Sequence, residues 1–105
     1  MNEYNINIMQ KAEQDLEDIY CYISNTLLEP EIAKKIYLTI YDRIQSLKNM
    51  LKRNPIVTEE PFKSIGLRKQ HAANYMILYI VNDENNTINI IRILYSKRNW
   101  QNLLS

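Results

Sequence analysis

The apolar residues of this 105-residue chain concentrate in two runs near its end, Tyr75–Val81 and Ile88–Tyr95. Between them lies a polar stretch, Asn82–Thr87. Short runs rich in Ile, Val and Tyr and bounded by Asn and Asp are typical of two strands joined as a hairpin. Both faces of each run are apolar, so the strands are either buried on both sides or buried on one side with a partner covering the other.

The first residues of the chain alternate between apolar and polar, with Tyr4, Ile6 and Ile8 on one face. That period of two predicts a strand over Tyr4–Met9. The segment is short and rich in asparagine, which favours an edge position in a sheet. An exposed edge strand also offers a partner a site for strand addition.

Apolar positions three and four residues apart predict two amphipathic helices, over about residues 11–28 and 31–51. Pro30 suits the first turn of the second helix, where its missing N–H costs nothing. Pro55 ends that helix, because the residue before a proline disfavours helical geometry. The short link predicts an antiparallel helical hairpin. The first stripe is Ala12, Leu16, Ile19, Tyr20, Ile23 and Leu27; the second is Ala33, Ile36, Tyr37, Ile40, Ile44, Leu47 and Leu51.

The remaining segments complete the fold. Residues 56–64 read as a loop, residues 67–71 as a short strand, and residues 98–104 as one or two helical turns anchored by Trp100. The order is β-α-α-β-β-β with a short C-terminal helix. This predicts one α+β domain over residues 1–105, with two layers: a helical hairpin packed on a mostly antiparallel sheet. The second face of the sheet would be left partly open, and a site or partner would lie there.

Composition excludes several classes of protein. No apolar run approaches the roughly 20 residues that cross a bilayer, and the N-terminus lacks the pattern of a signal peptide. The chain is therefore expected to be cytoplasmic, with no membrane partner. Gly66 is the only glycine, which excludes a glycine-rich phosphate loop. There is no Cys/His cluster with metal-ligand spacing, and Cys21 is single, so neither a metal nor another cofactor is expected.

Charge is divided unevenly along the chain. Residues 1–62 carry 7 Lys/Arg and 10 Asp/Glu, a net charge of −3, whereas residues 63–105 carry 6 and 2, a net charge of +4. The basic part could meet an anionic surface or form a solvated face. The acidic residues of the first helix, Glu13, Asp15, Glu17 and Asp18, are better explained by the helix dipole and a solvated face than by acid–base chemistry.

Residues 12–47 and 66–104 together resemble the RelE/ParE superfamily of toxins from type II toxin–antitoxin systems. The run Asp15–Ile23 is similar to the first helix of ParE-like members, and the end of the chain resembles the family's last strand, a basic residue and an aromatic-Leu-Leu tail. The resemblance implies the fold given above. It also implies a growth-inhibiting toxin that is neutralised by a cognate antitoxin, with operator DNA bound only through that antitoxin.

The superfamily divides by target. RelE-like members cut mRNA on the ribosome, using cationic side chains and a proton-transfer group. ParE-like members bind DNA gyrase and are not nucleases. Where RelE-like nucleases usually carry an arginine on the third strand, this chain has Met76. The small net charge of the chain, +1, also argues against binding to ribosomal RNA. The ParE-like alternative is therefore favoured; an inactivated toxin that only binds its antitoxin is a third alternative.

Candidate site residues differ between the two active alternatives. A gyrase-binding toxin would contact its target through Arg68, Lys69, Lys97, Arg98 and Trp100. A nuclease would use Arg68, Lys69, His71, Tyr95 and Arg98. Structural roles are also open: Arg98 could pair with an acidic residue, His71 could be an ordinary surface histidine, and a lone Trp100 in an amphipathic tail usually packs inward.

Overall fold

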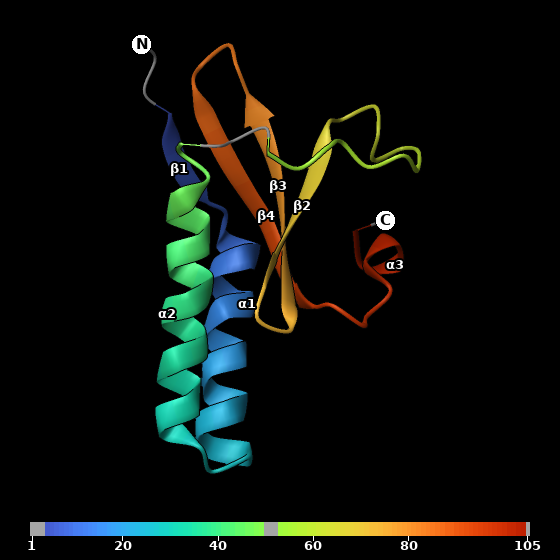
Figure 1. The fold of residues 1–105 in the computed structure, drawn as a ribbon. Helices are drawn as coiled ribbons and strands as arrows, with labels where there is room; N and C mark the ends of the chain where they lie inside the picture. Colours follow the sequence, from blue (N-terminus) through green and yellow to red (C-terminus); the bar gives the residue numbers. More distant parts are fainter. Residues whose placement is uncertain (1–3, 50–52, 105) are drawn as a thin grey trace.

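The computed structural model describes residues 4–49 and 53–104. Within these residues the chain forms strand β1 (Asn5–Ile8), helix α1 (Gln10–Cys21), a π-helical segment η1 (Tyr22–Thr26), helix α2 (Pro30–Ser46), strands β2 (Leu67–Ala72), β3 (Tyr75–Asn82) and β4 (Thr87–Tyr95), and helix α3 (Trp100–Leu104) (Figure 1). This order confirms the predicted α+β arrangement.

The four strands of the described chain lie in the order β1-β4-β3-β2. Strand β1 runs parallel to β4, pairing Ile6 with Ile88, and the other neighbours are antiparallel. The predicted edge position of β1 is confirmed. Because β1 pairs only with Thr87–Ile90, the second half of β4 has no strand on that side. Strand β4 also carries a bulge, since Leu78 pairs with Arg92 and Tyr79 with Ile90.

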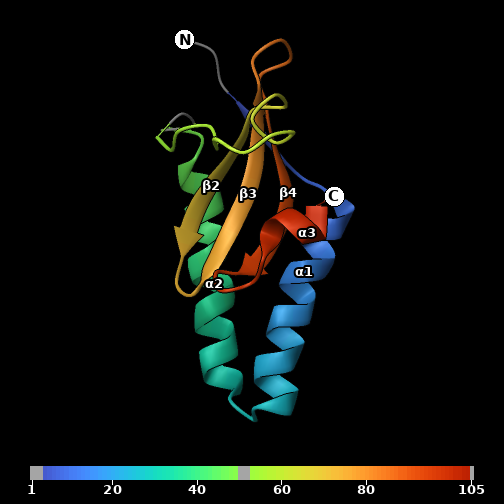
Figure 2. The same ribbon diagram turned by 90° about the vertical axis from the view of Figure 1, so that its right-hand side faces the viewer.

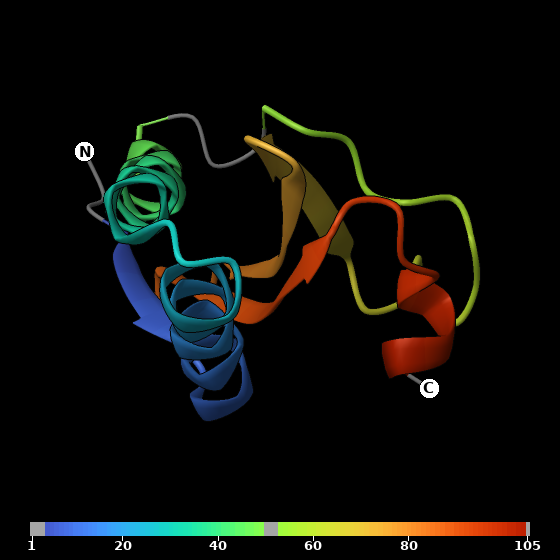
Figure 3. The same cartoon turned by 90° about the horizontal axis from the view of Figure 1, so that it is seen from below.

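Side chains on the two sides of the sheet form two separate buried clusters. On one side, α1 and α2 cover the sheet, and on the other side lie α3 and the segment that leads into β2 (Figure 3). Alternate residues of β3 enter opposite clusters, as the pleat requires. The helix side holds Ala12, Leu16, Ile40, Ile44, Leu47, Ala72, Ile77, Tyr79, Ile88, Ile90 and Ile93; the other side holds Val57, Phe62, Leu67, Met76, Leu78, Leu94 and Trp100.

The second face of the sheet is more covered than the sequence indicates. Figure 2, which looks onto this face, shows α3 lying across the strands. Trp100 packs edge-on against Phe62, with 5.0 Å between ring centroids, above the buried side chains of Met76 and Leu78. The two apolar faces of β3 are thus both buried by the chain itself. The expectation of a site on an open second face is wrong over this region.

The helices end earlier than predicted. Helix α1 changes to π-type hydrogen bonding at Tyr22, and the extra residue in that turn shifts the stripe of apolar positions around the helix axis. Leu27, predicted to lie on the buried stripe, is therefore 51% exposed, and Tyr20 lies at the rim against Tyr37. Helix α2 ends at Ser46, with Leu47 buried; Leu51 lies outside the described residues. No helix in the described ranges is long and apolar enough to span a membrane.

Candidate functional site: a groove between the helical hairpin and the sheet

The helical hairpin extends beyond the end of the sheet, and its far end overhangs the strands (Figure 1). Between the overhang and the strands lies a groove of about 730 Å³, which we call the hairpin groove. The apolar stripe of α1 continues into η1 past the last strand residues, so its later members have no sheet to cover them. The apolar lining is Ile19, Tyr22, Ile23, Leu27 and Ile32 from the hairpin and Tyr75, Ile93, Leu94 and Tyr95 from the strands.

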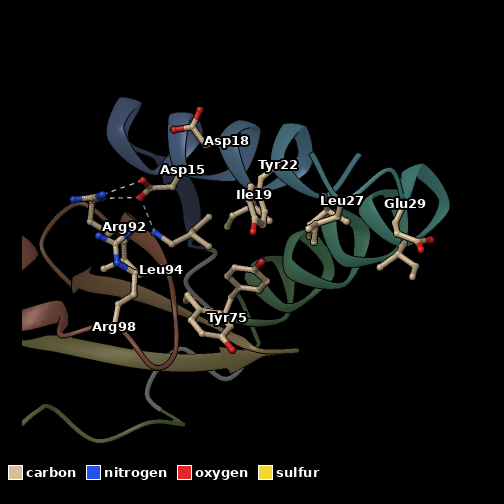
Figure 4. Close-up of a pocket in the computed structure, with 14 residues that line it drawn as sticks. Asp15, Asp18, Ile19, Tyr22, Leu27, Glu29, Tyr75, Arg92, Leu94 and Arg98 are labelled. Carbon is tan, nitrogen blue, oxygen red and sulfur yellow. Dashed lines mark hydrogen bonds and ion pairs between the residues drawn. The ribbon is translucent and has the colours of Figure 1, made fainter. Parts of the chain in front are cut away.

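Charged side chains lie at the borders of the hairpin groove. Figure 4 shows Arg98 toward one end and Glu29 toward the other. Asp18 adds a second carboxylate on the α1 side. No described residue forms an ion pair with Arg98, so its charge is available to a partner. Apart from Asp15 and Arg92, which pair with each other in one wall, the charges lie at the borders, and such an apolar channel suits a segment of protein chain better than a small polar substrate.

One wall of the groove is fixed by a carboxylate of α1. Asp15 accepts two hydrogen bonds from Arg92, from Nε at 2.7 Å and from a terminal nitrogen at 3.0 Å, and a third from the backbone N–H of Ile93 at 3.0 Å (Figure 4). The hydrogen bond that Arg92 donates to Asp15 raises the pKa of Arg92, while burial works in the opposite direction. Asp15 therefore satisfies a backbone donor on the part of β4 that β1 leaves unpaired.

This role corrects the assignment of Asp15 to a solvated helix face. Its side chain is only 13% exposed and Arg92 is 14% exposed, whereas Glu13, Glu17 and Asp18 are exposed as expected. Sequence reasoning missed both members of the pair. The available signal was Arg92 itself, the one charged residue in the apolar run Ile88–Tyr95. A buried charge requires a partner, and α1 is the nearest acidic element.

Two tyrosines form the strand side of the groove. The rings of Tyr75 and Tyr95 meet edge-on with centroids 5.8 Å apart. Burial raises the pKa of Tyr75, and Tyr95 and Tyr22 raise it further through their charge when ionised. The shift favours the protonated phenol of Tyr75, which can donate a hydrogen bond to a group in the groove.

The structure places some of the predicted cations near the groove. Arg98 and Tyr95 both line it, and Lys97 is exposed in the turn between β4 and α3. The backbone N–H of Arg98 donates to the carbonyl oxygen of Tyr95 at 2.9 Å, which fixes the turn that carries both cations. These three residues form one local group at the end of β4.

The other predicted site residues lie elsewhere on β2. Lys69 and His71 line a separate shallow pocket of about 260 Å³ with residues 54–59, and His71 is exposed. The Lys69 ammonium lies 5.1 Å from the ring centroid of Trp100. Arg68 lies on the helix-facing side of the sheet, where it donates to the carbonyl oxygen of Asn54. The candidate nuclease residues are thus divided between the groove, a second pocket and the opposite side of β2.

Trp100 and Met76 have interior positions. Trp100 is 6% exposed and anchors α3, in agreement with the inward packing that a lone tryptophan favours. Met76 is 2% exposed in the same cluster. Cys21 is exposed.

Solved structures share this fold. The chromosomal ParDE toxin–antitoxin system from P. aeruginosa matches with a TM-score of 0.73 and 22% identity, covering 90% of this chain and 98% of that chain. The toxin–antitoxin complex RelBE2 from Mycobacterium tuberculosis matches with a TM-score of 0.63 and 20% identity over 90% and 99%. A mutant of E. coli toxin RelE in the free state matches with a TM-score of 0.59 and 12% identity over 91% and 86%. No curated protein matches the sequence.

The fold is that of proteins from toxin–antitoxin systems. Within that class, the model of the family described as the ParE toxin of the type II toxin-antitoxin system parDE matches residues 6–100. The chain belongs to this ParE toxin family.

Proposed function

We propose that this ParE-type toxin arrests growth in the cytoplasm by binding a protein target, DNA gyrase, and that its cognate antitoxin neutralises it by filling the hairpin groove. The observation that supports binding over RNA cleavage is the dispersal of the candidate nuclease residues. Lys69 and His71 line one pocket and Arg98 lines another. A phosphoryl-transfer site needs its cations and proton-transfer group around one phosphate.

The place of Met76 supports the same proposal. The resemblance gives this position to an arginine in RelE-like nucleases, and here it carries a thioether that is 2% exposed beneath α3. A buried thioether cannot hold a phosphate. The exposed cations Lys97 and Arg98 are left for contact with the target.

The proposal for the antitoxin rests on the lining of the hairpin groove. Leu27 and Ile32 are about half exposed, at 51% and 47%, although both are large aliphatic residues. Exposed apolar surface in a concave site is typical of a partner interface. An amphipathic antitoxin segment would bury these side chains, with a carboxylate near Arg98 and a cation near Glu29. The edge of β1 is a second place where the antitoxin can add a strand.

The target is tested by adding purified toxin to two reactions. In cell-free translation with mRNA ends mapped by primer extension, we expect intact mRNA. In a gyrase reaction we expect loss of supercoiling and accumulation of cleaved DNA. Cuts restricted to ribosome-bound codons, abolished by Arg98→Ala, would establish the nuclease alternative instead. Normal growth on expression without the antitoxin would indicate an inactivated toxin.

The antitoxin site is tested with the double variant Leu27→Glu/Ile32→Glu. Burying two carboxylates in an apolar interface should weaken antitoxin binding by about 100-fold or more. Its Tm should change little because both positions are exposed. The matched control is Ile65→Glu, at a 54% exposed aliphatic residue outside the groove. Co-purification of the antitoxin with the double variant at the level of the control would contradict this placement.

A further inference from the structure

The turn that joins the two helices holds a leucine in an unfavourable backbone conformation. Leu28 has φ of +56°. It lies between two hydrogen bonds that close the helical segment: the N–H of Leu27 donates to the Tyr22 carbonyl and the N–H of Glu29 to the Ile23 carbonyl, both at 3.0 Å. This is the position after a helix end where glycine or asparagine is usual, because a Cβ is strained at positive φ.

Other residues at positive φ in the described chain are of more tolerant types. Gly66 has φ of +77°, Asn86 of +52° and the small Ala73 of +53°. Leu28 is the bulky exception, and backbone strain of this kind persists where it has a functional use.

Burial of the Leu28 side chain does not offset this backbone strain. It is 77% exposed and, unlike its neighbours Leu27 and Ile32, it does not line the hairpin groove. Both the backbone and the side chain therefore favour another residue here on grounds of stability. A bulky apolar residue that is both strained and 77% exposed at the tip of the hairpin is therefore not explained by stability, and strain of this kind points to a function.

We propose that Leu28 is the anchor by which the toxin docks on its protein target, inserting into an apolar pocket whose rim carries Lys or Arg. This proposal rests on the proposed function, growth arrest through protein binding. The charge around the tip identifies the kind of partner. The charged residues nearest to Leu28 in sequence are Glu29 and Glu31, both exposed, whereas the exposed Lys34 and Lys35 lie about one turn further along α2. Carboxylates beside the anchor complement a cationic rim.

The same charge argues against a membrane as the occupant. Anchors that insert into anionic bilayers are flanked by Lys and Arg, which the headgroups attract. The antitoxin is assigned to the groove, and Leu28 lies outside that lining. The proposed anchor Leu28 is therefore separate from the side chains that line the antitoxin's groove, whereas Glu29 belongs both to that lining and to the charged surroundings of Leu28.

The test uses Leu28→Asn and Leu28→Gly, because both residues accept a positive φ. Unlike most truncations, these variants should keep or raise the Tm by a few degrees, since they relieve strain. We expect growth inhibition at matched expression to fall by about tenfold or more, while co-purification of the antitoxin from the native operon stays within about twofold of wild type. Ile65→Asn, at a similarly exposed aliphatic residue away from the hairpin, should inhibit growth like wild type.

Each alternative occupant has its own signature. Growth inhibition by Leu28→Asn equal to wild type overturns the proposal and leaves the proposed function standing. Loss of antitoxin co-purification in that variant assigns Leu28 to the antitoxin and overturns it. Binding of the wild type to vesicles of anionic phospholipid, or its dimerisation in sedimentation, overturns it too if Leu28→Asn abolishes that behaviour. A wild type that does not inhibit growth rejects the proposed function and this inference together.

Discussion

Two regions of the molecule are built from the same kinds of side chains and differ in what covers them. On the second face of the sheet, Met76, Leu78 and Leu94 lie under Phe62 and Trp100 and are almost fully buried. In the hairpin groove, Tyr22, Leu27 and Ile32 are each about half exposed. A segment of the same chain closes the first region, whereas nothing in the described chain closes the second.

This difference separates the roles of the two regions. Closure by α3 and the segment before β2 buries apolar surface in the folded monomer, so it contributes to the free energy of unfolding. The groove leaves apolar side chains in water, so in our proposal they contribute free energy only when a partner binds. Substitutions in the two regions should therefore have different consequences. In the first region they should lower the stability of the fold, and in the second they should weaken binding.

The largest expected effect is on stability, at Trp100. Trp100→Ala should lower the free energy of unfolding by about 3–5 kcal/mol, because it opens a cavity against Phe62 and removes the anchor of α3. Lys69 would also lose its position over the indole ring, 5.1 Å from the centroid. Urea unfolding followed by far-UV circular dichroism measures the change.

The matched control for this prediction is Tyr22→Ala, an aromatic truncation in the groove. Tyr22 is 55% exposed, so the loss of stability should be below about 1 kcal/mol. Similar losses in the two variants would show that the groove is part of the stabilising core and would remove the distinction between the regions.

The sequence predicts the elements well because they depend on local periodicity. The alternation over Tyr4–Met9, the apolar runs at Tyr75–Val81 and Ile88–Tyr95, and the helical stripes each identify an element that the structure confirms. The closure of the second face depends instead on where Phe62 and Trp100 meet, 38 positions apart in the sequence. No local period encodes that contact.

The candidate site was harder to predict for the same reason. Arg68, Lys69 and His71 are close in sequence. Because successive side chains of a strand point to opposite faces, Arg68 lies on one side of the sheet and Lys69 and His71 lie on the other. Asp15 and Arg92 are 77 positions apart in the sequence. Their ion pair can be predicted only when the position of α1 over β4 is known. The groove forms because the helical hairpin extends beyond the end of the sheet (Figure 1). How far it extends depends on how the helices pack on the strands, which no local pattern in the sequence encodes.

An intermediate effect is expected at Asp15, which joins α1 to β4 at one wall of the groove. Asp15→Ala should lower the free energy of unfolding by about 2–3 kcal/mol, since it leaves Arg92 partly buried without its partner and orphans the N–H of Ile93. Asp18→Ala, three residues further along α1 and exposed, should cost less than about 0.5 kcal/mol. Chemical unfolding of both variants measures the difference.

A double variant sharpens this prediction. Asp15→Leu/Arg92→Met replaces both charges with apolar groups of similar size but still leaves the N–H of Ile93 without its acceptor, so its stability should recover only in part, to about 1–2 kcal/mol below wild type. If the double variant is as unstable as Asp15→Ala, the hydrogen bond to Ile93 rather than the ion pair is the main contribution of Asp15.

The smallest expected effect is the pH dependence that Tyr75 gives to stability. Burial raises the pKa of Tyr75 in the folded state. From about pH 10, the ordinary pKa of tyrosine, the unfolded chain loses this proton while the folded chain retains it, so the free energy of unfolding falls as the pH rises. Tyr75→Phe keeps the ring against Tyr95 and removes the proton, so its stability should decline less steeply between about pH 9 and 11. Urea unfolding at several pH values compares the two slopes; parallel profiles would mean that the groove wall at Tyr75 is as well hydrated in the folded chain as in the unfolded one.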